Sequence, residues 1–138
     1  MSYRNILAIA AIIAFIFGLG FVFMPTQLLA FYDVEVNAAG ALIGQLFGAA
    51  LLGFGVLNWL GRGVSDAQGR QALVTANLVS DGVGFVIALI GQISGATGVN
   101  ALGWSTVAIY ILLAAAFAYL RFMAKEAPMR AMAGGSRR

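Results

Sequence analysis

The chain of 138 residues contains no cysteine and no histidine, and only 9% of its residues are charged. Without the first two residue types it cannot form disulfides, Cys or His metal sites, a catalytic cysteine, a Ser-His-Asp triad or a histidine-ligated haem. Soluble domains carry about 25% charged residues, so this chain lacks the polar groups to cover a surface in water. Most of it must therefore face lipid. The few remaining catalytic side chains favour a protein that is not an enzyme.

What the sequence has instead is long apolar runs, since 62% of the residues are hydrophobic. Four runs are long enough to cross a bilayer, which takes about 20 helical residues. The first run exceeds the roughly 7–15 apolar residues of a signal peptide, so we expect it to remain as a span. We predict an all-α, integral membrane four-helix bundle formed by residues 1–123. Its spans lie at about 5–23, 38–60, 71–93 and 101–122, and residues 124–138 form a basic tail.

The basic residues all fall on one side of this four-span plan, whereas the opposite side carries only Asp33 and Glu35. The positive-inside rule then places both termini in the cytoplasm. This arrangement also explains the net charge of +3, and because the basic residues form no extended footprint we expect no nucleic-acid partner. The basic residues are Arg4, Arg62, Arg70, Arg121, Lys125, Arg130, Arg137 and Arg138.

The third span carries an acid at its centre, Asp81, in the stretch NLVSDGVGF. At 100° per residue the span has one clean apolar face and one stripe of polar and small residues. An acid at mid-membrane costs about 2.5–3.5 kcal/mol on insertion scales, so it is a candidate functional group. The polar stripe consists of Arg70, Leu73, Val74, Asn77, Asp81, Gly84, Phe85, Ala88 and Gln92.

Four polar residues are candidates for a buried polar or binding site: Asp81, Asn77, Gln92 and Tyr110, the last at similar depth on the fourth span. In an isolated chain we expect Asp81 to be neutral and hydrogen-bonded to Asn77 and Tyr110. Alternatively, Asp81 pairs with a group on another chain. A third alternative is that Ser80-Asp81-Gly82 forms a turn, but this would leave pieces too short to cross a membrane.

The second span carries a glycine face formed by Gly40, Gly44, Gly48 and Gly55. Small residues let helix backbones approach closely in lipid. The face is interpreted either as packing within the bundle or as the contact of a homo- or hetero-oligomer. On the same side of the membrane, Asn37 and Asn100 are predicted to cap the second and fourth spans.

The first half of the chain resembles small, four-helix bacterial membrane proteins of the DoxX-like kind. The shared features are Gly18 and Gly20, Pro25 followed by Leu28-Leu29, and GQLFGAALLGFGVLNW, within residues 18–59. Relatives often carry an arginine near the position of Gln45, so the glutamine here departs from the pattern. The resemblance implies a four-helix bundle in a bacterial inner membrane, and some members are associated with quinone-linked oxidoreductase systems.

Three functions are compatible with the sequence. The first is a structural or accessory subunit that packs its glycine face and polar stripe against partner membrane proteins, in a homo-oligomer or a larger complex within the lipid bilayer. The second is a proton-linked transporter or channel component that uses Asp81. The third is a quinone- or lipid-binding subunit of a membrane oxidoreductase. No cofactor is predicted from the residues, and a quinone or a lipid is the candidate ligand.

Overall fold

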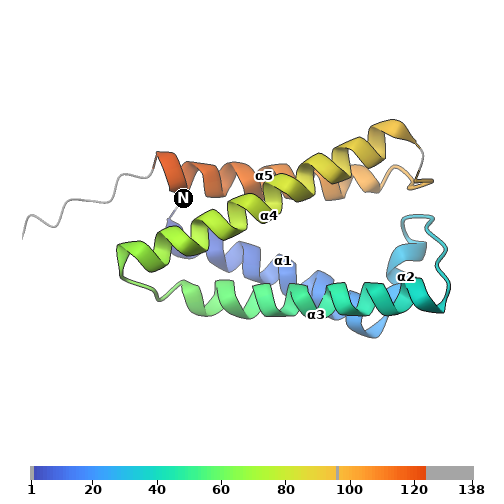
Figure 1. Cartoon of the computed structure of the whole chain (residues 1–138), viewed down its shortest axis with the longest axis horizontal. Coiled ribbons are helices and arrows are strands. Elements are labelled where there is room, and N and C mark those ends of the chain that lie inside the picture. Colours follow the sequence, from blue (N-terminus) through green and yellow to red (C-terminus); the bar gives the residue numbers. More distant parts are fainter. Residues whose placement is uncertain (1, 96, 124–138) are drawn as a thin grey trace, which may run out of the picture.

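The computed structural model describes residues 2–95 and 97–123, and within them all regular structure is helical (Figure 1). The helices are α1 (Tyr3–Phe23), α2 (Pro25–Ala30), α3 (Ala38–Gly61), α4 (Ala67–Ser94) and α5 (Gly103–Phe122). All except the short α2 are long and apolar enough to span a membrane. The predicted all-α membrane bundle is confirmed at this level, and the basic tail, residues 124–138, lies outside the described residues.

Side-chain caps and a proline set the helix boundaries. Asn37 accepts a hydrogen bond from the Gly40 backbone N–H at 2.9 Å, and Asp66 accepts one from the Gly69 N–H at 2.7 Å. Each cap satisfies a donor that the first helical turn leaves free. Pro25 starts α2, where its missing N–H costs nothing. The predicted cap at Asn37 is therefore confirmed.

One predicted helix cap is wrong, and the alternative turn that the sequence analysis disfavoured does not form. Asn100 is not the N-cap of α5, because the helix begins at Gly103. Its Oδ1 accepts the Leu102 N–H at 2.9 Å in the turn before the helix, and its Nδ2 donates to the Phe31 carbonyl at 2.9 Å. The alternative turn at Ser80-Asp81-Gly82 is also absent. Helix α4 runs through these residues without interruption, because its N-cap and its continuous apolar face outweigh the local preference of Asp-Gly for a turn.

The long helices form two tight pairs, α1 with α3 and α4 with α5 (Figure 1). In the first pair the backbones nearly touch at Gly18 and Gly48. A Cβ atom added to Gly48 would lie 2.8 Å from the Val22 nitrogen and 2.9 Å from the Gly18 carbonyl oxygen. The two pairs contact each other far less than the helices within each pair do.

The pairs meet at the end of the bundle that carries the start of α1, the α3–α4 turn and the end of α5, called here the termini end. A core of Ile6, Leu7, Val74 and Phe117 joins the pairs there, and Leu7 and Phe117 are fully buried. At the opposite end, called here the α2 end, the connections 31–37 and 97–102 lie close together (Figure 1). The two pairs are thus held together at both ends, and they contact each other little in the middle of the bundle.

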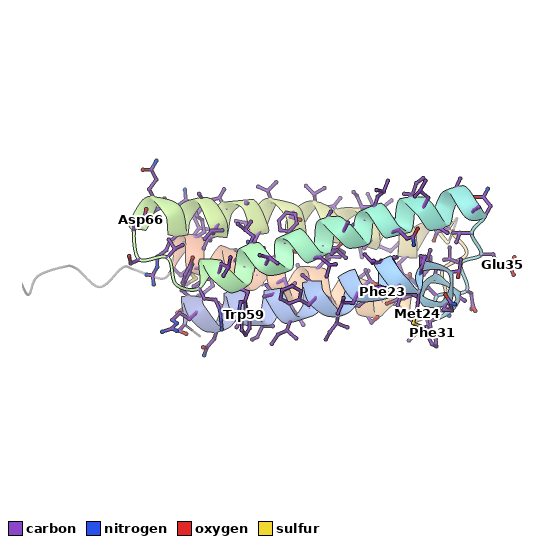
Figure 2. The ribbon with its side chains drawn as sticks, turned by 90° about the horizontal axis from the view of Figure 1, so that it is seen from below. Phe23, Met24, Phe31, Glu35, Trp59 and Asp66 are labelled. Atoms are coloured by element: carbon purple, nitrogen blue, oxygen red, sulfur yellow. The ribbon has the colours of Figure 1, made fainter. Side chains whose placement is uncertain are left out.

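The outer surface of the bundle is apolar along its length, and Figure 2 shows the side chains projecting from it. Trp59 and Asp66 lie toward the termini end, whereas Phe23, Met24, Phe31 and Glu35 lie toward the α2 end. The predicted lipid face of α4 is exposed, as Val83 (54%) and Ile87 (67%) show. Such a surface suits lipid contact.

A candidate binding cavity between the helix pairs

A cavity of about 460 Å³ lies between the two helix pairs, on the α2 side of the core. This volume falls in the range of small-molecule sites, about 300–1,000 Å³. The cavity is not sealed, because Phe47 and Ile87 line it and are 44% and 67% exposed. Phe47 lies on α3 and Ile87 on α4, two helices that touch little, so the cavity opens sideways between them.

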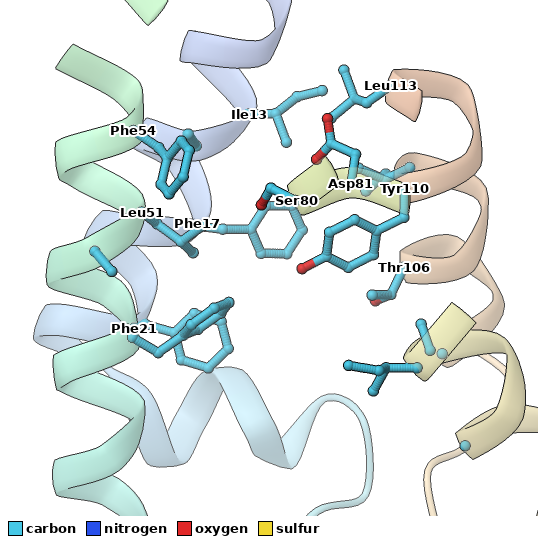
Figure 3. A pocket seen from close by; sticks show the side chains of 18 of the residues that line it. Ile13, Phe17, Phe21, Leu51, Phe54, Ser80, Asp81, Thr106, Tyr110 and Leu113 are labelled. Atoms are coloured by element: carbon cyan, nitrogen blue, oxygen red, sulfur yellow. The ribbon is translucent and has the colours of Figure 1, made fainter. Parts of the chain in front are cut away.

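One wall of the cavity is apolar and aromatic. Phe17 and Phe21 of α1 and Leu51 and Phe54 of α3 project into it from one side (Figure 3). The Phe21 ring also packs edge-to-face on the Phe47 ring, with centroids 5.2 Å apart. These residues were not among the site residues predicted from the sequence. Their signal was the spacing of three or four residues that places Phe17 with Phe21, and Leu51 with Phe54, on one helix face.

The opposite wall is polar, and it is built by α4 and α5. Ser80 and Asp81 come from α4, and Thr106 and Tyr110 come from α5 (Figure 3). The Tyr110 hydroxyl points into the cavity, away from the Asp81 carboxyl group. An amphipathic ligand could therefore place its apolar body against the aromatic wall and its polar head against this one.

Asp81 is a buried polar residue that lacks a hydrogen-bond partner among the described residues. It is only 9% exposed, and its Oδ2 has no hydrogen-bond partner within residues 2–95 and 97–123. The carboxyl group lies near Ile13 and Leu113, which cannot donate (Figure 3). The predicted hydrogen bonds from Asn77 and Tyr110 to Asp81 are therefore wrong. A buried acceptor left without a partner costs about 1–3 kcal/mol, so a ligand that donates a hydrogen bond to Asp81 would recover this free energy.

Asn77 does not reach Asp81 because its amide is used elsewhere. Its Nδ2 donates to Asn58 Oδ1 at 2.8 Å and to the Leu73 carbonyl at 2.9 Å, and its Oδ1 accepts from Asn58 Nδ2 at 2.9 Å. Asn58 and Asn77 are 2% and 4% exposed and lie on α3 and α4. This reciprocal pair lines the cavity at the termini end and joins the two helix pairs next to the core.

Tyr110 is held in place by the lack of a side chain at Gly84. A Cβ atom at Gly84 would lie 2.7 Å from Tyr110 Cδ1 and 2.8 Å from its Cζ. The ring thus lies directly on the backbone of α4, one turn beyond Asp81. Gly84 belongs to the polar stripe predicted from the sequence, and its function there is to admit this ring.

Gln92, the fourth polar candidate, lies at the α2 end of the cavity. Its side-chain amide donates to the Asn100 carbonyl at 3.1 Å, and the Asn100 N–H donates to the Tyr32 carbonyl at 3.1 Å. With the Asn100–Phe31 bond, these contacts join the connection 97–102 to the one that follows α2. Gln92 lines the same cavity as Asp81, and its hydrogen bond stabilises the wall of the cavity at the α2 end.

The predicted glycine face is largely turned inward. Gly44, Gly48 and Gly55 of α3 are buried, and their nearest neighbours are residues of α1 or of Pro25. Gly40 is partly exposed and packs on Val36. These contacts lie within the bundle, and the close approach of α1 to α3 depends on them.

The cavity contains few ionisable groups. Among its described lining residues Asp81 is the one formally charged group. The described residues also contain no cluster of three or more acidic side chains that would hold a metal ion. An acid in an apolar cavity can hold a polar head group or a cation.

Comparison of the chain with protein-family models, with curated proteins and with solved structures finds no match. The resemblance to DoxX-like proteins therefore stays a prediction, and the functional argument rests on the geometry of the cavity.

Proposed function

We propose that this protein is a membrane-embedded binding protein for a small, mostly apolar molecule with one polar head group. The observation that carries the proposal is the buried, unpartnered Oδ2 of Asp81 in the wall of a cavity of about 460 Å³. The cavity offers an aromatic surface for an apolar body, and Tyr110 adds a second hydrogen-bonding group. Pockets that bind small molecules have this composition, apolar walls with a few convergent polar groups.

The proposal differs from the accessory subunit suggested by the sequence. That hypothesis depended on the glycine face and the polar stripe, and both are turned largely toward the interior of the bundle. A channel is also less well supported, because the Asn58–Asn77 pair and the core at Leu7 and Phe117 close the cavity toward the termini end. The quinone- or lipid-binding hypothesis is compatible with the cavity as it stands.

The test is to fill the cavity and measure binding. Ala88 lines the cavity on α4, whereas Ala76 is exposed on the same helix. We expect phenylbutanol to stabilise the wild-type protein and the Ala76→Phe variant in lipid nanodiscs, by about 2.7 kcal/mol at a concentration of 100 times its Kd. The Ala88→Phe variant should show little of this stabilisation.

The two phenylalanine variants present the same bilayer to the probe, so unspecific partitioning into lipid affects both equally. Equal stabilisation of Ala88→Phe and Ala76→Phe would show that the probe does not use the cavity. No stabilisation of either protein would remove the support for a binding function of this kind.

The orientation of the bundle in the membrane is part of the proposal. Arg4, Arg62, Arg70 and Arg121 lie at the termini end, which supports a cytoplasmic location for that end in a bacterial inner membrane. The chain has no cysteine of its own, so single cysteines report without background. In intact cells a membrane-impermeant maleimide should label Glu35→Cys and spare Ser65→Cys, and the reverse pattern would invert the topology.

A further inference from the structure

Asp81 faces the cavity without a counter-charge from the described part of the chain. The nearest basic residues along α3 and α4, Arg62 and Arg70, lie at the termini end and already have partners. The Arg62 Nε donates to the Trp59 carbonyl at 2.8 Å, and its guanidinium lies 3.4 Å from the centroid of the Trp59 ring. Arg62 is therefore occupied at the surface.

Arg70 has contacts of the same kind. Its Nε donates to the Val64 carbonyl at 2.9 Å, and its guanidinium lies 4.4 Å from the centroid of the Tyr3 ring. It is also separated from Asp81 by eleven positions of α4, which corresponds to roughly 16 Å along the helix axis. At that distance the Arg70 guanidinium forms no hydrogen bond with the Asp81 carboxyl group. Neither Arg62 nor Arg70 is therefore a donor to Asp81.

The rest of the cavity wall favours a positive charge. Phe17, Phe21, Phe54 and Tyr110 line the same cavity as Asp81 (Figure 3). The face of an aromatic ring is electronegative and attracts cations, most strongly where water is excluded. The same rings provide the apolar contact that the carbon skeleton of a ligand requires.

We infer that the ligand is a lipophilic amine whose protonated nitrogen donates a hydrogen bond to Asp81 while its apolar body lies against Phe17, Phe21 and Phe54. This inference rests on the proposed binding function and adds the chemical class of the ligand. An ammonium group donates to the Asp81 carboxylate and supplies the missing charge in one contact, and such charge-assisted bonds are about twice as strong as neutral ones. A neutral acceptor, such as a quinone carbonyl, could pair with Asp81 only through a protonated carboxyl group and would bring no charge.

The experiment uses probes that share one phenylbutyl body and differ in the head group. Phenylbutylamine carries a charge and N–H donors, phenylbutyltrimethylammonium carries the charge alone, phenylbutanol donates without charge, and phenylbutanone only accepts. Affinity is measured by equilibrium dialysis against nanodiscs that contain the wild-type protein, with Ala88→Phe nanodiscs as the blank. Each probe is thereby corrected for its own partitioning into lipid.

We expect the amine to bind roughly tenfold to a hundredfold more tightly than the alcohol, as a charged hydrogen bond predicts. The trimethylammonium probe should lie between them. In Asp81→Asn the amine should lose its advantage, while the alcohol keeps its wild-type affinity and thereby shows that the cavity is intact. The control Asp66→Asn removes an acid at the α4 cap, where asparagine caps equally well, and should keep the preference.

The results separate the two proposals. If amine and alcohol bind the wild-type cavity equally, or if Asp81→Asn keeps the preference for the amine, the amine inference is overturned and the binding function stands. A tighter affinity for phenylbutanone would also overturn it, in favour of a neutral acceptor such as a quinone. Should Asp81→Asn fail to fold, the order of the probes on the wild-type protein still decides. If no probe binds above the Ala88→Phe blank, the proposed function itself fails.

Discussion

The reciprocal amide pair between Asn58 and Asn77 gives the most direct test of how the helix pairs are held together. Three hydrogen bonds converge on it, at 2.8, 2.9 and 2.9 Å, the last from Asn77 to the Leu73 carbonyl. Hydrogen bonds between membrane helices contribute about 0.6 kcal/mol on average and at most about 1.7. The two bonds between the amides should therefore contribute a coupling free energy of about 1–2 kcal/mol.

Replacing one partner should cost more than this coupling. In Asn77→Leu the Asn58 amide stays buried without a partner, and such a group costs about 1–3 kcal/mol. Adding Asn58→Leu removes the orphaned amide, so the double variant should be less destabilised than the sum of the two single variants. Leucine has the same branched arrangement of side-chain heavy atoms as asparagine and is somewhat larger, so the substitution leaves no new cavity.

The free energy of unfolding is measured by titrating the protein in mild detergent with sodium dodecyl sulfate and following tryptophan fluorescence. Trp59 is adjacent to Asn58 and reports on this region. A second cycle that combines Asn77→Leu with Gln45→Leu serves as control, because Gln45 is exposed and bonds to the Val22 carbonyl instead. That cycle should be additive within about 0.5 kcal/mol. A coupling of the same small size between Asn58 and Asn77 would refute the reasoning.

Two glycine substitutions test the close contacts, each against a neighbouring glycine with no atom within 4 Å of an added Cβ. Gly48→Ala should destabilise the protein by about 1–3 kcal/mol because the methyl group forces α1 away from α3, whereas Gly53→Ala should be neutral or slightly stabilising in the same unfolding assay. Gly84→Ala should displace the Tyr110 ring and weaken phenylbutanol binding about tenfold, the equivalent of about 1.4 kcal/mol, whereas Gly82→Ala should leave the affinity unchanged. Equal effects within either pair would contradict the packing described.

The helices and the inward face of α4 were predictable because each depends on local pattern alone. Hydropathy over about 20 residues identifies a span, and a period of 3.6 residues places Val74, Asn77 and Asp81 on one face. The structure buries these residues and exposes Val83 and Ile87. Burial in a bundle of apolar helices follows from the stripe without knowledge of the neighbouring helix.

The hydrogen-bond partners were not predictable in this way. Asn77 and Tyr110 lie at suitable depths for Asp81, but the rotation of each helix about its axis decides which groups meet. That rotation follows from close packing at sites such as Gly18–Gly48 and Gly84–Tyr110, which a single sequence does not specify. The width of the cavity also depends on how the two pairs meet at the core, so its aromatic wall became visible only in three dimensions.

Because the cavity opens sideways between α3 and α4, the concentration that governs binding of the proposed ligand is its concentration in the bilayer. A molecule that reaches Asp81 through lipid is governed by its mole fraction in the bilayer, and an aqueous dissociation constant would understate or overstate occupancy according to how strongly the molecule partitions. If the proposed ligand enters in this way, acyl chains are expected to compete with it for the same aromatic wall. Membrane composition therefore becomes a regulator of occupancy, and a change of lipid could load or empty the site without any change in the protein.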